Sequence, residues 1–404
     1  MILEGEAVQM DVTELCQKFS GKTVMVTGAT GLIGKALVKA LLSVGEVSVS
    51  GEDLMAEVTA MPEKKTAEQL AVSRQSAKNM QIETPVKVVA VVRSIDKARK
   101  LFGDLSRHAE AEGKLVYRVG DIRTVELSDV QADYIVHAAS DTSSKSFVER
   151  PVETLDVILG GTRHMLDYAA SCKTLKKFLF LSTMEVYGTP ATDEKITEQH
   201  GTNLDTMKVR TCYPEGKRLA EMLCTSFGKE YGVPVNVLRL TQTFGEGVSY
   251  EDGRVFAEFV RCAIEKRDIV LKTKGETKRS YLYVGDAVSA ILRVLTDGVV
   301  GEAYNAANEE TYCSIYEMAA MVAERFGDGK VRVRIEEDEK NDRGFAPTLH
   351  MNLDTSKLQA LGWRAEVDLP EMYQRMMEDM KRAQSKSRGQ VTLKFYKLGK
   401  GYCI

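Results

Sequence analysis

The chain has 404 residues and a formal net charge of −3, with 44% hydrophobic and 28% charged residues. This length suits one large domain or two fused domains of an ordinary globular protein. The slightly acidic balance excludes a general attraction to nucleic acid, so we expect no nucleic-acid partner. No apolar run is long enough to cross a bilayer, and the acidic first residues lack the features of a secretion signal. We therefore expect a cytoplasmic protein without a membrane partner.

The cysteines and histidines give no sign of a metal site. The seven cysteines are odd in number and scattered without metal-ligand spacing, which is typical of reduced thiols. The five histidines form no cluster. We expect no bound metal, and His137 is interpreted as a packed strand residue rather than a catalyst.

Six short apolar runs alternate with helical stretches in the first 240 residues. The predicted strands are residues 22–26, 86–92, 115–119, 134–138, 178–181 and 235–238, and a helix is expected over 33–44. The second run is almost continuously apolar, as expected of a parallel strand buried on both faces. This alternation predicts an α/β fold built on a doubly wound parallel (Rossmann) sheet.

The same pattern suggests a division of the chain. We expect residues 20–240 to form a dinucleotide-binding Rossmann domain. Within it, residues 45–84 are polar and indicate a solvated insertion, with a lid or an oligomer contact as the less favoured alternative. Shorter pieces follow, so residues 241–383 are predicted to form mainly a small α/β substrate-binding region, and residues 384–404 a loosely attached tail.

A glycine-rich turn, TGATGLIG at positions 27–34, follows the first predicted strand. Gly28, Gly31 and Gly34 permit a tight turn, a close approach to phosphate and close helix–strand packing. The start of the next helix offers unpaired N–H groups to a pyrophosphate. A glycine turn without a ligand is the alternative, but the strand before it and the helix after it favour a dinucleotide site. The predicted contacts from this turn also include Thr30, Leu32 and Ile33.

Arg93 and Ser94 follow the second predicted strand, where an acidic residue commonly binds the ribose 2′-hydroxyl of NAD. A guanidinium and a hydroxyl suit a 2′-phosphate, so these residues favour NADP slightly over NAD. The preference is slight because an arginine can also stack on adenine.

Two further strand ends supply candidate cofactor contacts. Asp121 and Ile122 follow the third predicted strand and are placed to address the adenine edge. Ala138, Ala139 and Ser140 follow the fourth, and their small side chains leave room for a flat cofactor.

Tyr213 and Lys217 lie four residues apart on a predicted helix and therefore share one face. Free tyrosine titrates near pH ~10. A lysine charge about 5 Å away would lower this pKa by roughly two units, and an oxidised nicotinamide would lower it further. Tyr213 could then serve as a general base near neutral pH. An incidental surface tyrosine and lysine are the alternative reading.

Thr183 and Glu185 come directly after the fifth predicted strand. The carboxyl end of such a strand faces the ligand crevice of a doubly wound sheet, so Thr183 is placed to hydrogen-bond the reacting oxygen. Glu185 is a candidate acid or base, with a solvated loop carboxylate as the equal alternative.

In this order, the motifs resemble the extended short-chain dehydrogenase/reductases, within the nucleotide-sugar epimerase/dehydratase family. The similarity spans roughly residues 22–380 and includes segments 133–139, 161–162, 185–188, 216–221, 279–286 and 361–363. The resemblance implies that Thr183, Tyr213 and Lys217 form the catalytic triad and that Gly28, Gly31 and Gly34 line the pyrophosphate. Tyr213 and Lys217 would also contact the cofactor.

The resemblance also implies substrate contacts and a partner. Arg279 would hold the phosphates of a nucleoside-diphosphate sugar, and Arg254 resembles a second phosphate contact of the sugar decarboxylase branch. A homodimer is implied through the helix that bears Tyr213, where Leu219, Met222 and Leu223 serve that contact or the core.

Departures from the family pattern bear on the reaction. Met184 stands where dehydratases carry Asp and decarboxylases usually Ser, and a thioether cannot protonate a leaving hydroxyl. Gln242 and Ile158 each replace a common Asn, and Gln242 is a candidate substrate contact. Glu185 matches the dehydratase and decarboxylase pattern.

These features predict an NAD(P)-dependent nucleotide-sugar epimerase that works through a 4-keto sugar and recycles its cofactor. The alternatives are a dehydratase or decarboxylase of the same family, an NADPH-dependent reductase, and a non-catalytic dinucleotide sensor.

Overall fold

The computed structural model describes residues 12–43, 84–337 and 348–398, with side chains described through Ser385. The expected insertion at 45–84 lies outside the described residues apart from Thr84. In the described part of the chain, none of the helices combines the length and the apolar character needed to cross a membrane.

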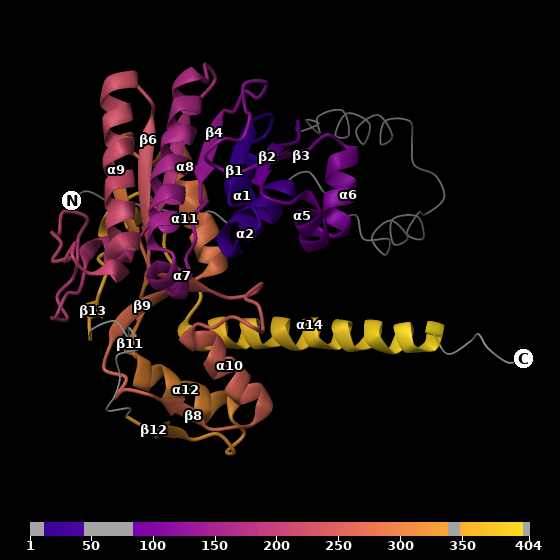
Figure 1. Cartoon of the computed structure of the whole chain (residues 1–404), viewed down its shortest axis with the longest axis vertical. Helices are drawn as coiled ribbons and strands as arrows, with labels where there is room; N and C mark the ends of the chain where they lie inside the picture. Colours follow the sequence, from indigo (N-terminus) through magenta and orange to yellow (C-terminus); the bar gives the residue numbers. More distant parts are fainter. Residues whose placement is uncertain (1–11, 44–83, 338–347, 399–404) are drawn as a thin grey trace, which may run out of the picture.

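A parallel sheet of seven strands forms the centre of the larger part of the molecule (Figure 1). The strand order is β10-β6-β5-β4-β1-β2-β3, and every neighbouring pair is parallel. The bounds are β1 Thr23–Thr27, β2 Lys87–Val92, β3 Leu115–Val119, β4 Tyr134–His137, β5 Lys177–Thr183, β6 Val235–Leu240 and β10 Ala303–Ala306. The predicted doubly wound sheet is confirmed, and all six predicted strands are present. The order reverses between β1 and β4, which is where such sheets bind their ligands.

Helices cover both faces of this sheet, each over its own hydrophobic core. One face carries α1 (Val12–Gln17), α2 (Leu32–Leu42) and α11 (Val284–Asp297), with α5 (Ile95–Phe102) and α6 (Asp104–Ala111) near β3. The other face carries α7 (Ser144–Glu149), α8 (Pro151–Ser171) and α9 (Cys212–Tyr231). The predicted helix over 33–44 is α2. Helices α8 and α9 pack side by side (Figure 1).

A smaller region follows β6 and has its own core. Its sheet contains β7 (Gln242–Phe244), β9 (Lys278–Tyr283), β11 (Asn308–Ser314) and β13 (His350–Met351), and β8 (Ile269–Leu271) pairs with β12 (Val333–Ile335). Its helices are α10 (Val255–Glu265), α12 (Ile315–Phe326) and α14 (Leu369–Leu398), whereas α13 (Ser356–Gln359) packs on β10 of the large sheet. Stacked Phe244 and Phe256 and the buried Tyr373 of α14 anchor this third core.

The two regions are interleaved in sequence. β10 joins the large sheet and α11 packs on it, although both follow residue 241. The backbone of α14 continues to Leu398, so the expected boundary at 384 falls within this helix. In Figure 1 the far end of α14 extends away from the smaller region.

One short chain of contacts joins the two regions beside α2. The Nζ atom of Lys35 donates to the carbonyl of Gly247 over 3.3 Å. The N–H of the same Gly247 donates to Asp379 of α14 over 2.8 Å. The peptide groups of Gly247 thus connect the helix after the glycine turn to the C-terminal helix.

Candidate active site

The glycine turn, called the cradle below, connects β1 to α2 and packs closely against the end of β4. Gly28 has a φ of +64°, and a Cβ on it would lie 2.7 Å from the carbonyl oxygen of Ala138. A Cβ on Gly34 would lie 2.3 Å from the carbonyl oxygen of Gly28. Gly31 is the N-cap residue of α2 and has no side chain to accept a hydrogen bond. The first N–H groups of the helix therefore remain available to a ligand. These residues fit a dinucleotide pyrophosphate.

Thr27 ties the cradle to the end of β4. Its hydroxyl accepts hydrogen bonds from the N–H groups of Ala138 and Ala139, both at 3.1 Å. It also hydrogen-bonds Nδ1 of His137 over 2.8 Å. His137 is buried and contacts Thr162 through Nε2, and burial lowers its pKa to about 3. It is a neutral, packed strand residue, as predicted.

The second and third strand ends lie close to one another. Hydrogen bonds from Arg123 lower the pKa of Asp121 to about 2, and the positive charge of Arg93 contributes to this shift. Arg93 is exposed, whereas the hydroxyl of Ser94 caps α5 by accepting from the N–H of Lys97. The region expected to hold the adenosine ribose therefore contains two arginines and one carboxylate.

The remaining predicted cofactor contacts lie at this edge, in the turn or at the end of β4. Ile122 is buried against the backbone of α8, where a Cβ on Gly161 would meet its side chain at 2.8 Å. Ser140 donates to the carbonyl of Asp141 over 3.2 Å. The partly buried residues of the turn and of the β4 end are Thr30, Leu32, Ile33, Ala138, Ala139 and Ser140.

Tyr213, Thr183 and Lys217 converge at the carboxyl end of β5. The hydroxyl of Thr183 lies close enough to the phenol of Tyr213 to lower the pKa of that phenol. Nζ of Lys217 donates to the carbonyl of Leu181 over 2.9 Å and stands 6.0 Å from the centre of the Tyr213 ring. All three side chains of the expected triad are buried. The structure therefore brings them together at the same edge of the sheet as the glycine turn, with β4 between β5 and β1.

The electrostatics of this triad differ from the expectation. Burial raises the pKa of Tyr213 above its ordinary value, and the carboxylate of Glu185 raises it further. Burial lowers the pKa of Lys217 to about 8. The expected depression of the Tyr213 pKa by Lys217 is wrong for the chain's own groups, because loss of hydration outweighs the attraction of a distant ammonium.

Glu185 forms an ion pair that the sequence did not predict. Its Oε2 lies 3.0 Å from Nη1 of Arg210, which precedes α9 in the short helix η2 (Val209–Thr211). The guanidinium lies over the ring of Phe147 at 5.2 Å, and that ring stacks on Tyr213 with 4.3 Å between centroids. A charged pair thus borders the phenol.

Two of the departures from the family pattern lie in packed surroundings. Met184 begins the short helix η1 (Met184–Tyr187), is buried, and accepts a contact from the hydroxyl of Thr241 at Sδ over 3.2 Å. Ile158 is also buried, and a Cβ on Gly216 would approach its Cδ1 to 3.3 Å. Ile158 therefore packs against α9 between Tyr213 and Lys217.

The candidate phosphate contacts lie in the smaller region. Arg279 donates from Nη1 to Oε1 of Gln242 over 3.1 Å, and its Nε is buried without a hydrogen-bond partner. Arg254 instead pairs with Asp252 at 2.6 Å and lies over the ring of Phe256 at 4.7 Å. The two arginines are thus held by different neighbours.

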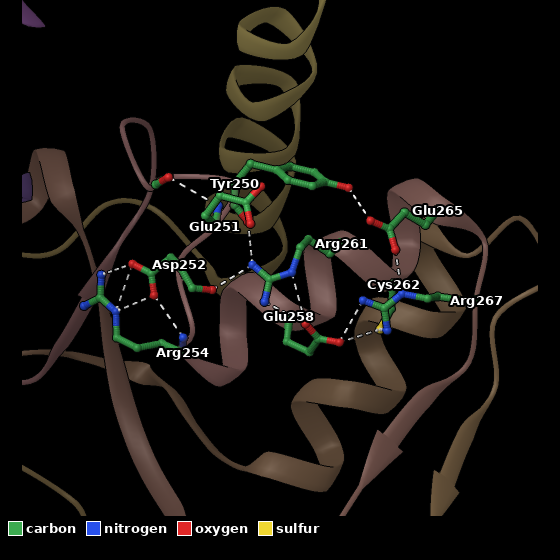
Figure 2. A network of polar contacts seen from close by, with 10 residues as sticks. Tyr250, Glu251, Asp252, Arg254, Glu258, Arg261, Cys262, Glu265 and Arg267 are labelled. Carbon is green, nitrogen blue, oxygen red and sulfur yellow. Dashed lines mark hydrogen bonds and ion pairs between the residues drawn. The ribbon is translucent and has the colours of Figure 1, made fainter. Parts of the chain in front are cut away.

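Figure 2 shows that Arg254 ends a polar network around α10. Nη1 of Arg261 donates to the carbonyls of Tyr250 and Asp252, at 2.5 and 2.7 Å. The same Arg261 pairs with Glu258 at 2.6 Å. The network fixes the loop before α10 and so orients Arg254.

Sequence reasoning also missed Glu221 and the two residues that bind its carboxylate, Ser182 and Arg239. The position of Glu221, four residues after Lys217, was a usable signal. Among the residues that the structure describes, no group of three or more His, Cys, Asp or Glu side chains could hold a metal ion.

Comparison with known proteins decides the family. Residues 24–307 match the NAD dependent epimerase/dehydratase family. The chain belongs to this family. The match covers both the glycine cradle and the triad at the end of β5, and it confirms the resemblance to extended short-chain nucleotide-sugar enzymes.

Curated relatives include two UDP-glucuronic acid decarboxylases. Decarboxylase 1 of Xenopus tropicalis is 31% identical over 247 residues, which span 61% of this chain and 56% of that protein. Decarboxylase 6 of Arabidopsis thaliana is 31% identical over 254 residues, spanning 62% of this chain and 71% of that protein.

Solved structures show the same fold at lower identity. A UDP-glucose 4-epimerase of Thermotoga maritima superposes with a TM-score of 0.66 at 19% identity, over 90% of this chain and 99% of that one. A UDP-glucuronic acid 4-epimerase of Bacillus cereus, solved with UDP-glucuronic acid and NAD, has a TM-score of 0.66 at 20% identity over 89% and 99%.

Proposed function

We propose that this family member oxidises C4 of a nucleoside-diphosphate sugar to a ketone and reduces a ketone again in the same site. The observation that supports this most is the convergence of Thr183, Tyr213 and Lys217 at the end of β5, at the same edge of the sheet as the cradle of Gly28, Gly31 and Gly34. A phenol, a hydroxyl and an ammonium at this place suit the removal and return of a hydroxyl proton.

Each residue of the site has a separate role in the proposed oxidation and reduction at C4. Gly28, Gly31 and Gly34 would hold a nicotinamide dinucleotide, which would supply hydride transfer at C4 and, in its oxidised form, positive charge near Tyr213. Thr183 hydrogen-bonds the C4 oxygen and Tyr213 takes its proton. Tyr213 must be a phenolate to take this proton, a form that the charge of an oxidised nicotinamide would favour. Once it holds the proton, burial favours the phenol, which gives a proton back when the ketone is reduced. Lys217 orients the nicotinamide ribose.

Decarboxylation of a uronic acid is the outcome that we favour. A 4-ketone makes the C6 carboxylate a β-keto acid: the C5–C6 bond breaks, carbon dioxide leaves, and the electron pair moves into an enolate on C4–C5. A proton is then added at C5 before the ketone is reduced. Two observations support this branch: the Glu185–Arg210 pair beside Tyr213, and the decarboxylase names of the similar curated proteins. A guanidinium suits a sugar carboxylate.

C4 epimerisation is the second candidate. Met184 favours it, since a buried thioether supplies no proton donor at the position where related enzymes carry Asp or Ser. In this case the 4-keto sugar rotates within the site and receives the hydride on the other face of C4. The product then has the same mass as the substrate.

The experiment that separates the candidates is incubation of the purified chain with NAD⁺ and either UDP-glucuronic acid or UDP-glucose. Mass spectrometry and NMR identify the product: loss of carbon dioxide supports decarboxylation, and unchanged mass with an inverted C4 supports epimerisation. In a parallel incubation with NADPH in place of NAD⁺, stoichiometric consumption of NADPH would point instead to a reductase. A chain that binds NAD⁺ yet converts neither sugar would contradict the proposal.

We also propose that the chain forms a homodimer, and the charged residues at the ends of β2 and β3 bear on the choice between NAD and NADP. Arg93 and Arg123 favour a 2′-phosphate and Asp121 a free 2′-hydroxyl, so direct titration with NAD⁺ and NADP⁺ decides between them. Leu219 and Met222 on α9 are 50% and 61% exposed and suit a homodimer contact, which sedimentation analysis would test.

A further inference from the structure

The carboxylate of Glu221 lies over the junction of two parallel strands, one helical turn beyond Lys217. Ser182 of β5 and Arg239 of β6 stand opposite one another in the strand register. Both bind Glu221: the Ser182 hydroxyl donates to Oε1 over 2.5 Å, and Nη2 of Arg239 donates to Oε2 over 2.6 Å. α9 is therefore fastened to both strands at one point.

The last three residues of β5 each contact a different residue of α9. The carbonyl of Leu181 accepts from Lys217, the hydroxyl of Ser182 donates to Glu221, and the hydroxyl of Thr183 meets Tyr213. The three helix positions are spaced by four, so they share one face of α9. A displacement of Glu221 would therefore also displace the ammonium and the phenol.

The groups around Lys217 give Glu221 an electrostatic role as well. Burial lowers the pKa of Lys217 to about 8, and the negative charge of Glu221 is the largest of the effects that raise this pKa. Burial raises the pKa of the Cys224 thiol and of Tyr213, and it lowers the pKa of His137 to about 3, so these three neighbours are neutral at pH ~7. Among the described groups beside Lys217, Glu221 thus supplies the negative charge.

Arg239, which binds the carboxylate of Glu221, is itself fixed by further hydrogen bonds. Nη1 of Arg239 donates to the hydroxyl of Tyr187 over 3.0 Å and to the carbonyl of Glu198 over 2.8 Å. Tyr187 in turn donates to Asn305 of β10 over 2.6 Å. Arg239 is therefore fixed by the large sheet and by the segment before α9, and it holds Glu221 in one position.

We propose that Glu221 is a positioning residue that keeps the ammonium of Lys217 charged and in place at the end of β5. Glu221 acts through Lys217 and does not contact the reacting atoms. The inference rests on the proposed function, in which the ammonium of Lys217 orients the nicotinamide ribose beside Tyr213.

The test compares how activity and NAD⁺ affinity depend on pH. Glu221→Gln removes the charge and keeps the size, so Lys217 should lose its proton at lower pH. We expect the alkaline limb of both profiles to move to lower pH by roughly one unit or more. Glu221→Asp retains the charge and should restore the limb. Arg239→Gln removes the competing cation and should move the limb the opposite way, which keeps the test open if Glu221→Gln does not fold.

Two further variants separate charge from packing. Ser182→Ala removes the hydroxyl but leaves the carboxylate, and should lower kcat without moving the limb. Glu215→Gln is the matched control, because it removes a carboxylate from the same helix that pairs only loosely with Arg218, at 3.6 Å. Its limb should match that of the wild type.

The two readouts distinguish the possible failures. An unmoved limb in Glu221→Gln, or an equal shift in Glu215→Gln, would overturn the role of Glu221. A wild type that binds NAD⁺ but converts no nucleotide sugar would defeat the proposed function, while the NAD⁺ titration would still decide the role of Glu221. A wild type that binds no NAD⁺ would overturn both.

Discussion

Arg279 is held in place by Gln242, whose Oε1 accepts from its Nη1 over 3.1 Å. The two residues lie on paired strands, since Gln242 of β7 stands opposite Tyr281 of β9. The buried Nε of Arg279 has no hydrogen-bond partner, although a buried donor of this kind normally has one. The unsatisfied donor suits the phosphate oxygen that the proposed substrate would bring.

Gln242→Glu should weaken substrate binding more than Gln242→Leu. The new carboxylate would pair with Arg279 and repel a diphosphate, whereas leucine only removes the acceptor. We expect a rise in the Kd for UDP-glucuronic acid of roughly tenfold or more for the Glu variant. Calorimetry in a Tyr213→Phe background measures binding without turnover. Equal Kd values for both variants and the parent would argue against Arg279 as a phosphate contact.

Tyr213→Phe should abolish turnover and leave cofactor binding intact. The substitution removes the oxygen that exchanges a proton with the substrate, and the ring keeps its stacking on Phe147. We expect kcat to fall by roughly 100-fold or more. Fluorescence titration with NADH is the control. Preserved turnover together with lost cofactor binding would reverse the assigned role.

Alanine at Gly31 and at Gly34 should have different effects. A Cβ on Gly34 meets a backbone oxygen at 2.3 Å, so the turn must shift, and we expect a loss of about 1–3 kcal/mol in unfolding free energy. Gly31 has an ordinary φ of −73° and its Cβ would be 3.3 Å from the Gly28 carbonyl. Gly31→Ala should therefore fold normally but bind NAD⁺ roughly tenfold more weakly, or about 1.4 kcal/mol.

Thermal unfolding and NAD⁺ calorimetry on both variants test this contrast. Normal NAD⁺ affinity in Gly31→Ala would mean that the pyrophosphate does not approach this turn.

Asp286 should make the protein less stable above neutral pH than an asparagine at the same place. Burial raises its pKa from the ordinary 3.8 to about 6, despite hydrogen bonds from the N–H groups of Glu366 and Val367. Because the folded-state pKa is the higher one, the stabilising contribution is complete below pH 3.8 and is lost as the pH rises through about 6.

Asp286→Asn should therefore be the more stable protein at pH ~8, by at most roughly 3 kcal/mol, and the advantage should vanish near pH ~4. Urea unfolding of both proteins across this range measures the difference. A constant difference at every pH would show that Asp286 does not titrate in this way.

The sequence was sufficient to predict six of the seven strands of the parallel sheet, because most of them are nearly unbroken apolar runs. It did not predict β10, a short edge strand that contains Asn305. The sequence also located the triad, since Thr183 ends such a strand and the spacing of Tyr213 and Lys217 fixes their shared helix face. It did not predict the sheet of the smaller region, whose strands are short and pair across large separations, such as Lys278 with Ser314.

The ion pairs within the site were also beyond the sequence. Glu185 meets Arg210 from a different segment, and Glu221 meets Arg239 only because α9 crosses the β5–β6 junction. Such pairs are set by tertiary packing, and residue spacing carries no record of them. For the same reason the pKa of Tyr213 was misjudged: a spacing of four reveals a neighbouring lysine but not the loss of water around the phenol.

The contacts of Gly247 have a practical consequence for shortened versions of the chain. Its carbonyl is held by Lys35 and its N–H by Asp379, near the middle of α14. A deletion from the carboxyl end that stops short of residue 379 leaves both attachments in place. A deletion that also removes Asp379 breaks its contact with Gly247. A truncation far from the glycine turn in sequence would then disturb α2, the helix that begins at this turn.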